Sequence, residues 1–269
     1  MSRMLNRAAL ALAIFVLPLS AQAHRAWFLP SATVLSGNDP WLTVDAAISN
    51  DLFYFEHMPM RLGDLVVTAP DGSTVAPQNA STGRYRSTFD VQLTQQGTYK
   101  VASVSSGLNA RYRLGTESKR WRGSAAELPT AIPAGATDVE VSESVRRIET
   151  FATLGKPTLR ATEPTGVGLE FVPVTHPNDL YAGEEAKFRL LLDGKPAAGL
   201  EVEVVPGGIR YRDRLNELKL VTDADGGFAV TWPAPGMYWL SASVRDAAGT
   251  IANARRSLTW VATLEVLRP

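Results

Sequence analysis

The sequence predicts an all-β protein made of two tandem β-sandwich domains of the immunoglobulin-like or transthyretin-like type. Short stretches of alternating apolar and polar residues, rich in Val, Thr and aromatic side chains, are separated by clusters of Gly, Pro, Asn and Asp. No stretch keeps the 3.6-residue period of a long helix. The same order of turn and strand signals occurs in both halves of the chain, which favours two similar domains.

The alternating stretches define the expected strands. In the first half they cover residues 41–47, 64–68, 86–93 and 98–104. In the second half they cover residues 187–192, 201–205, 228–231, 238–244 and 257–266. Residues 144–153 also alternate, and this strand either completes the first sandwich or crosses to the second. The rest of residues 115–165 has loop composition, which predicts an irregular connecting segment.

The two halves share a turn, strand and tyrosine pattern. In each half an Asp-Gly turn precedes a strand with two apolar residues, and a Gly-x-Tyr sequence opens the next strand, at Tyr99 and Tyr238. A Tyr at a strand start anchors the corner of many immunoglobulin-like sandwiches. We therefore interpret these residues as architecture.

The first 23 residues have the features of a secretory signal. Arg3 and Arg7 give a positive start, residues 8–19 an apolar run, and residues 21–23 (Ala-Gln-Ala) a small-x-small cleavage site. No later segment approaches the roughly 20 unbroken apolar residues of a membrane span. We expect a signal peptide over residues 1–23, then a periplasmic mature protein with an N-terminal domain over 24–165 and a C-terminal domain over 166–269.

Composition limits the function classes. The 27 basic and 27 acidic residues balance, which argues against a nucleic-acid surface. Cysteine is absent, so disulfides, thiolate metal ligands and a lipid-anchored cysteine are excluded. The sequence contains no nucleophile elbow, phosphate-binding Gly loop, dinucleotide fingerprint or zinc-protease helix. It therefore gives little support to an enzyme.

His24 is the residue that points to a function. A cut after Ala23 would make it the first residue of the mature chain, whereas a cut after Ala21 would leave it third. An N-terminal histidine offers its α-amine and a ring nitrogen, both of which can bind one cation near neutral pH. This residue is therefore a preformed chelate with two nitrogens.

The other two histidines are His57 and His176, each next to a proline that interrupts regular strand pairing. Imidazole and amine nitrogens suit nickel, cobalt, copper or zinc. We predict a metal site in which the His24 chelate is completed by His57, or by both His57 and His176. Its expected cofactor is a divalent transition metal, nickel or cobalt, with copper as the alternative. If Met58 and Met60 joined the site, their thioethers would favour cuprous copper.

Several blocks of the chain resemble an uncharacterised family of exported bacterial proteins. That family is described as the periplasmic component of cobalt and nickel uptake systems, sometimes with a glycoside-hydrolase-like label. The similar blocks are residues 24–30, 49–57, 169–173, 193–196 and 222–226. Relatives often begin their mature chain with a histidine, so the resemblance implies a ligand role for His24. It also implies an inner-membrane metal importer or an outer-membrane receptor as partner.

Three functions follow from these observations. The first is periplasmic binding of nickel or cobalt for delivery to a membrane uptake system. The second is copper binding, or a copper oxygenase that uses an N-terminal histidine brace. The third is a metal-free envelope scaffold or adhesion module.

Overall fold

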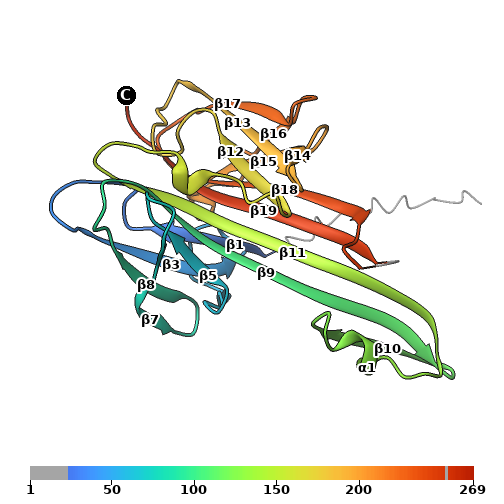
Figure 1. Ribbon diagram of the computed structural model, residues 1–269. Helices are drawn as coiled ribbons and strands as arrows, with labels where there is room; N and C mark the ends of the chain where they lie inside the picture. The colour runs from blue at the N-terminus through green and yellow to red at the C-terminus, as the bar shows by residue number, and fades with distance from the viewer. Residues whose placement is uncertain (1–23, 252–253) are drawn as a thin grey trace, which may run out of the picture.

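The computed structural model describes residues 24–251 and 254–269, and the predicted signal peptide over residues 1–23 lies outside this part. The all-β prediction is confirmed, because the described residues fold almost entirely into strands (Figure 1). The helical segments are short: α1 (Leu128–Ala131), η1 (Arg160–Thr162) and η2 (Ile209–Tyr211). Among the described residues, no helix is long and apolar enough to cross a membrane.

Residues 24–251 and 254–269 form three sheets. The five-stranded sheet has the order β1-β3-β8-β7, with β4 paired to β3. Its strands are β1 (Arg25–Pro30), β3 (Trp41–Ser49), β4 (Met58–Pro59), β7 (Gln78–Thr82) and β8 (Ser87–Gln92). The four-stranded sheet has the order β12-β13-β14, with β17 paired to β13. Its strands are β12 (Leu169–Pro173), β13 (Glu185–Leu192), β14 (Lys195–Pro196) and β17 (Gly227–Thr231).

The central ten-stranded sheet has the order β16-β15-β18-β19-β11-β9-β5-β6, with β10 paired to β9 and β2 to β11. Its strands from the first half are β2 (Val34–Leu35), β5 (Leu65–Thr68), β6 (Thr74–Val75), β9 (Gly97–Leu114), β10 (Glu117–Gly123) and β11 (Ala136–Leu154). Its strands from the second half are β15 (Glu201–Pro206), β16 (Leu218–Val221), β18 (Gly236–Ala248) and β19 (Arg255–Val266). Parallel pairing of β11 with β19 joins the two halves into one sheet.

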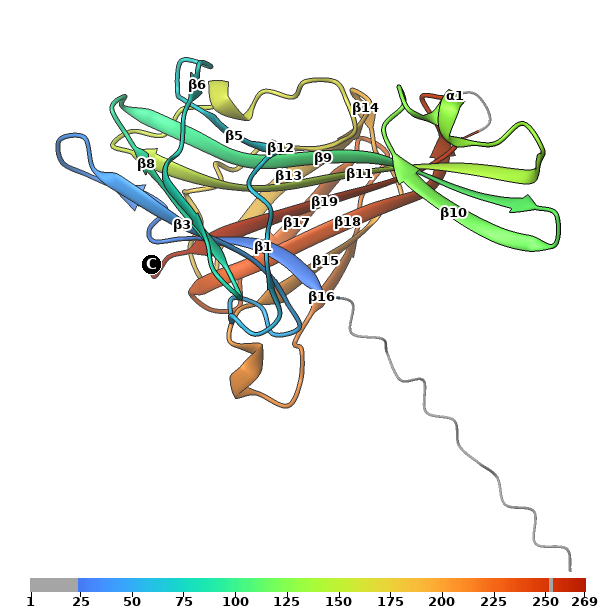
Figure 2. The ribbon, with the colours of Figure 1, turned by 90° about the horizontal axis from the view of Figure 1, so that it is seen from below.

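The central sheet carries one hydrophobic core on each face. Val261 packs with Trp27 and Phe89 of the five-stranded sheet, whereas its neighbour Trp260 packs with Phe171 and Phe188 of the four-stranded sheet. Successive side chains of a strand point to opposite faces, so the two outer sheets cover opposite sides of the central one. The result is two β-sandwiches that share a middle layer (Figure 2). The domain boundary at residue 165 stays a prediction.

The repeated tyrosine pattern marks two similar corners, as the sequence predicted. The buried Tyr99 hydroxyl accepts a hydrogen bond from the Gln95 backbone N–H at 2.8 Å. The buried Tyr238 hydroxyl donates to the Ala234 carbonyl at 2.7 Å. In both cases the bond reaches the backbone four residues upstream and fixes the chain where it enters the next strand.

The segment between the halves differs from the expected irregular connection. Residues 136–154 form the long strand β11, and β10 pairs with the extended β9. We call this extension, residues 107–144, the arm, and Figure 1 shows it projecting from the sandwiches. Most arm side chains are exposed on both faces, so the apolar alternation of a half-buried strand is absent there. The polar composition of the arm therefore led to the prediction of a loop.

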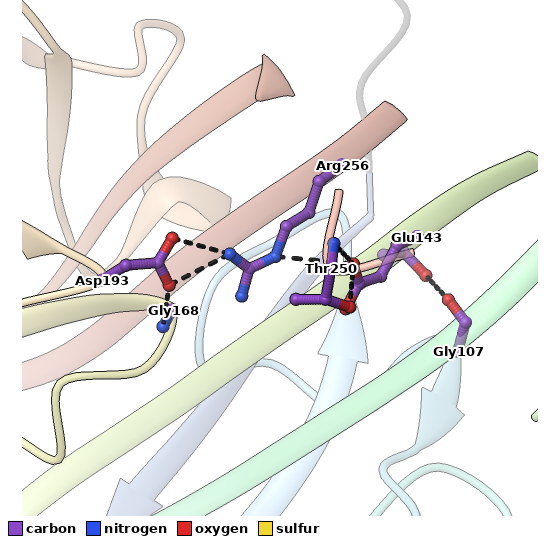
Figure 3. Close-up of polar contacts among 7 residues, drawn as sticks. Gly107, Glu143, Gly168, Asp193, Thr250 and Arg256 are labelled. Carbon is purple, nitrogen blue, oxygen red and sulfur yellow. Dashed lines mark hydrogen bonds and ion pairs between the residues drawn. The ribbon is translucent and has the colours of Figure 1, made fainter. Parts of the chain in front are cut away.

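An ion cluster around the buried Arg256 ties the base of the arm to the second sandwich (Figure 3). The Arg256 side chain is buried, and its Nη1 donates to both carboxylate oxygens of Asp193, at 3.0 and 2.8 Å. Its Nε lies 3.8 Å from Glu143, whose Oε2 accepts hydrogen bonds from the N–H and hydroxyl of Thr250. Asp193 also accepts from the Gly168 N–H at 2.9 Å. The 193–196 block therefore has a structural role.

Candidate metal centre

His24 and His57 meet at one edge of the five-stranded sheet. Their ring centroids are 3.8 Å apart with an interplanar angle of 23°, and both side chains are exposed. His24 directly precedes β1, and His57 directly precedes β4. These strands lie on either side of β3, where Arg25 stands opposite Ser49 and Met58 opposite Ile48. The two histidines therefore flank the end of β3, and their rings stack there.

The loop over residues 50–57 is held in place by hydrogen bonds. The carboxylate oxygen Oε1 of Glu56 accepts from the backbone N–H groups of Asn50 and Asp51, each at 2.9 Å. The buried Trp27 donates its indole N–H to the Ser49 hydroxyl at 2.8 Å, and this hydroxyl donates to the Asp51 carbonyl at 2.6 Å. Each contact restrains the backbone that carries His57.

Aromatic side chains anchor the same loop to the core. The Trp27 ring contacts Phe53 and Phe55, with centroid distances of 5.4 and 5.6 Å. Phe53 has a φ of 62°, a conformation that a bulky residue adopts only when its surroundings require it. The packing on Trp27 meets that condition. The 49–57 block is thus built to present His57 at a fixed place.

The start of β1 is fixed on the central sheet. The Trp239 indole N–H donates to the Ala26 carbonyl at 3.0 Å. The Arg25 guanidinium lies over the Trp239 ring at 5.4 Å and 3.6 Å from the Glu203 carboxylate. These contacts hold the backbone next to His24, so the position of its ring follows from the fold.

A polar groove of about 1020 Å³ opens beside His24. Charged residues of β15 and of the following loop, which contains η2, supply much of its wall. Arg212 shapes that loop, because its guanidinium donates to the carbonyls of Pro206, Gly207 and Leu215. Arg210 lies over the Tyr54 ring at 4.0 Å and 3.9 Å from the Asp51 carboxylate. No motif in the sequence indicated this groove, because its wall comes from segments that are far apart along the chain.

His176 lies away from the other two histidines. Its Nε2 is 2.9 Å from the Thr98 hydroxyl and 3.2 Å from the Thr158 carbonyl, and its Nδ1 accepts from the Asn178 N–H at 3.1 Å. The Thr98 hydroxyl is hydrogen-bonded to the Thr153 hydroxyl. The Thr153 N–H donates to the carbonyl of Thr33, which lies beyond the far end of β1. Six residues of strand separate that end from His24, a length of about 20 Å. The structure therefore does not bring His176 to the predicted site.

The reason is that both ring nitrogens of His176 serve the fold. Burial is the largest influence on its pKa and lowers it from the ordinary value of 6.5, against smaller opposing effects of the Thr158 carbonyl and Asp179. The folded state therefore keeps this ring neutral, while the unfolded chain binds a proton more readily. It follows that protonation of His176 below about pH 6.5 favours unfolding.

We expect His176→Ala to lower the free energy of unfolding by about 1–2 kcal/mol at pH 7.5, because the Asn178 N–H loses its acceptor. As pH falls below 6.5, the free energy of unfolding should decrease less in the variant than in wild type, because the variant lacks the His176 imidazole. Urea denaturation at several pH values measures both effects. His57→Ala, an exposed histidine, is the control and should change stability by less than about 0.5 kcal/mol. Equal pH dependence of His176→Ala and wild type would contradict this assignment.

The two methionines of this region lie in different surroundings. Met60 is buried in the first core, where it fills space, whereas Met58 is 43% exposed. Within residues 24–251 and 254–269, no three side chains of His, Cys, Asp or Glu cluster as a metal site. The predicted cleavage before His24 would add its α-amine as a third nitrogen beside the two imidazoles.

Solved structures that match this chain include the D0-D1 domain of Intimin, at 12% identity and a TM-score of 0.22, over 89% of this chain and 97% of that one. A DUF4785 family protein from Legionella pneumophila matches at 8% identity and a TM-score of 0.24, over 80% of this chain and 50% of that one. The alpha-2-macroglobulin of Escherichia coli matches at 14% identity and a TM-score of 0.24, over 92% of this chain and 20% of that one.

No curated protein matches this chain. A family model described as a domain of unknown function, DUF4198, matches residues 21–246 and so covers the two histidines and the arm, but not β19. The chain therefore belongs to the DUF4198 family.

Proposed function

We propose that the mature protein binds a divalent transition-metal ion in the periplasm, through the α-amine of His24 and the imidazoles of His24 and His57. The observation that carries this proposal is the 3.8 Å stacking of two exposed imidazoles, one of which follows the predicted cleavage site. Exposed rings can turn about their side-chain bonds, so a nitrogen of each can reach one ion. Because the backbone at both positions is anchored, little ordering is needed on binding.

The ligand set bears on the choice of metal. Nitrogen ligands suit nickel, cobalt and copper, and tetragonal nitrogen sites are typical of Cu(II) and Ni(II). With His176 placed elsewhere, one amine and two imidazoles remain. We keep nickel or cobalt as the proposed cargo, in line with the family resemblance, and copper as the alternative.

The proposed role is capture of the ion and its delivery to a membrane uptake system. An exposed site with few ligands can release its ion to a partner that supplies more of them. The polar groove next to His24 gives such a partner a surface beside the ion, with charged side chains of both signs such as Arg25, Glu203 and Arg210. Affinity should fall below about pH 6, because protons compete with the metal for ligand nitrogens.

The test is calorimetric titration of protein that begins at His24 with nickel, cobalt and copper salts at neutral pH. We expect one ion per chain, and a loss of affinity of at least about tenfold for His57→Ala. His176→Gln is the matched control, and its affinity should equal that of wild type. If no metal binds, or if His176→Gln weakens binding as much as His57→Ala does, the proposal is wrong.

The same three nitrogens are also the ligand set of a copper brace, which favours the copper oxygenase as second candidate. The groove beside His24 could then hold a substrate. Consumption of peroxide by copper-loaded wild type, and not by His57→Ala, would support this enzyme. If the protein binds copper but the loaded protein consumes no peroxide, the oxygenase is excluded and metal capture and delivery is the function that stands.

A further inference from the structure

The arm carries a cluster of arginines on one face. Arg120 on β10 stands directly opposite Arg111 on β9, and Arg122 stands opposite Asn109. In the next pair of strands, Arg111 is opposite Glu140, and Asn109 is opposite Ser142. Opposite residues of an antiparallel pair share a face, so these side chains point to the same side of the arm.

These residues line a single cavity of about 720 Å³, to which Arg255 of β19 also contributes. Glu140 is the one acidic residue among those that line it. Asn109 and Ser142 add uncharged polar groups to its floor. The cavity is therefore strongly cationic, although the chain as a whole has a formal net charge of zero.

The three arginines that β9 and β10 contribute to the cavity form no ion pair in the described part of the chain. Among the described residues, the side chains of Arg111, Arg120 and Arg122 take part in no ion pair within 4 Å, and all three are exposed. Other charged residues of the arm do pair, such as Lys119 with Glu117. Like charges directly opposite each other destabilise a sheet. The repulsion between Arg111 and Arg120 thus costs stability, and the only opposite charge that the described strands place directly across from either of them is Glu140, beyond ion-pair distance of Arg111.

We propose that this cavity binds a ligand that carries two or more phosphate groups. The planar guanidinium of arginine can donate hydrogen bonds to two oxygens of one phosphate. The basic residues that line the cavity are all arginines. A phosphate monoester carries nearly two negative charges and three acceptor oxygens, so it can accept hydrogen bonds from more than one guanidinium. The cavity exceeds the size of a single phosphate and falls in the range of small-molecule sites. The phosphates come from a soluble molecule or from a lipid headgroup.

The test is titration of the protein with inorganic tripolyphosphate at low ionic strength. We expect one ion per chain, bound more tightly than orthophosphate. The double variant Arg111→Gln/Arg120→Gln should weaken binding at least about tenfold, because two charge-assisted contacts are lost. The control is Arg84→Gln/Arg189→Gln, two exposed arginines outside the arm with the same change in net charge, and it should bind within about twofold of wild type.

Thermal melting shows whether the double variant is folded. We expect its melting temperature without ligand to stay close to that of wild type, because loss of the repulsion between Arg111 and Arg120 offsets loss of the attraction between Arg111 and Glu140. Sedimentation with phosphatidic acid vesicles, against phosphatidylcholine vesicles, separates the two sources of phosphate. If the protein binds phosphatidic acid vesicles selectively, and the double variant does not, the ligand is a lipid headgroup. If the protein binds tripolyphosphate but no vesicles, the ligand is soluble. Equal weakening in the control pair, or no binding of either probe, would overturn the proposal.

Discussion

A protein that keeps Ala23 in front of His24 is expected to lose metal affinity by at least about 100-fold. The peptide bond turns the His24 amine into an amide, so the two-nitrogen chelate disappears and only two separate imidazoles remain. Loss of a group that merely orients a ligand already costs about 10–100-fold, and loss of a ligand should cost no less. Calorimetric titration of two preparations, one starting at Ala23 and one at His24, measures the difference.

Equal unfolding midpoints of the two metal-free preparations would show that the extra residue acts on binding alone. The added alanine is uncharged and joins an exposed residue, so we expect no change in stability. Equal metal affinity of the two preparations would mean that the amine is not a ligand and that the imidazoles act alone.

Trp27→Ala is expected to lower the free energy of unfolding by about 3–5 kcal/mol. The side chain is fully buried in the first core, and its indole N–H is bonded to Ser49. The substitution removes the packing surface of Phe53 and Phe55 and leaves the loop before His57 without its anchor. We therefore expect metal affinity to fall as well, even under conditions where the variant is folded. Urea denaturation and metal titration measure the two effects.

Trp41→Ala is the matched control for this substitution. Trp41 lies on β3 of the same sheet but is 46% exposed, so its loss should cost no more than about 1 kcal/mol and leave metal binding unchanged. Similar losses of stability for the two variants would show that Trp27 does not organise this part of the fold.

Strands with one buried face could be predicted from the sequence. Strands that are buried on both faces, or exposed on both faces, could not. Residues 87–92 alternate buried and partly buried side chains, and the predicted strand there agrees with β8. In β1 the central residues Ala26, Trp27 and Phe28 are all buried, so no alternation marks this strand. In the arm, polar side chains stand on both faces, and the sequence therefore resembles a loop.

The candidate site was predictable only in part. His24 could be identified from the cleavage signal, because that inference is local in sequence. The contact between His24 and His57 depends on the pairing of β1 and β4 with β3, which no spacing along the chain determines. The Thr98 and Asn178 partners that hold His176 come from separate segments, so its structural role was equally hidden.

Two of the other blocks that carry the resemblance contain carboxylates that bind turns. Glu170 in the 169–173 block accepts hydrogen bonds from the backbone N–H groups of Thr165 and Gly166 and lies 3.2 Å from Arg147. Asp223 in the 222–226 block accepts from the N–H groups of two residues in its own turn. These blocks fix turns, whereas the blocks at residues 24–30 and 49–57 also place the two histidines.

The most direct test of the metal site is anomalous X-ray diffraction from crystals of protein that begins at His24, loaded with nickel or copper. The account predicts one anomalous peak between the rings of His24 and His57, at about 2.0–2.1 Å from a nitrogen of each ring and from the His24 amine. A peak at His176 instead, or no peak at the His24 and His57 pair at full metal loading, would contradict it.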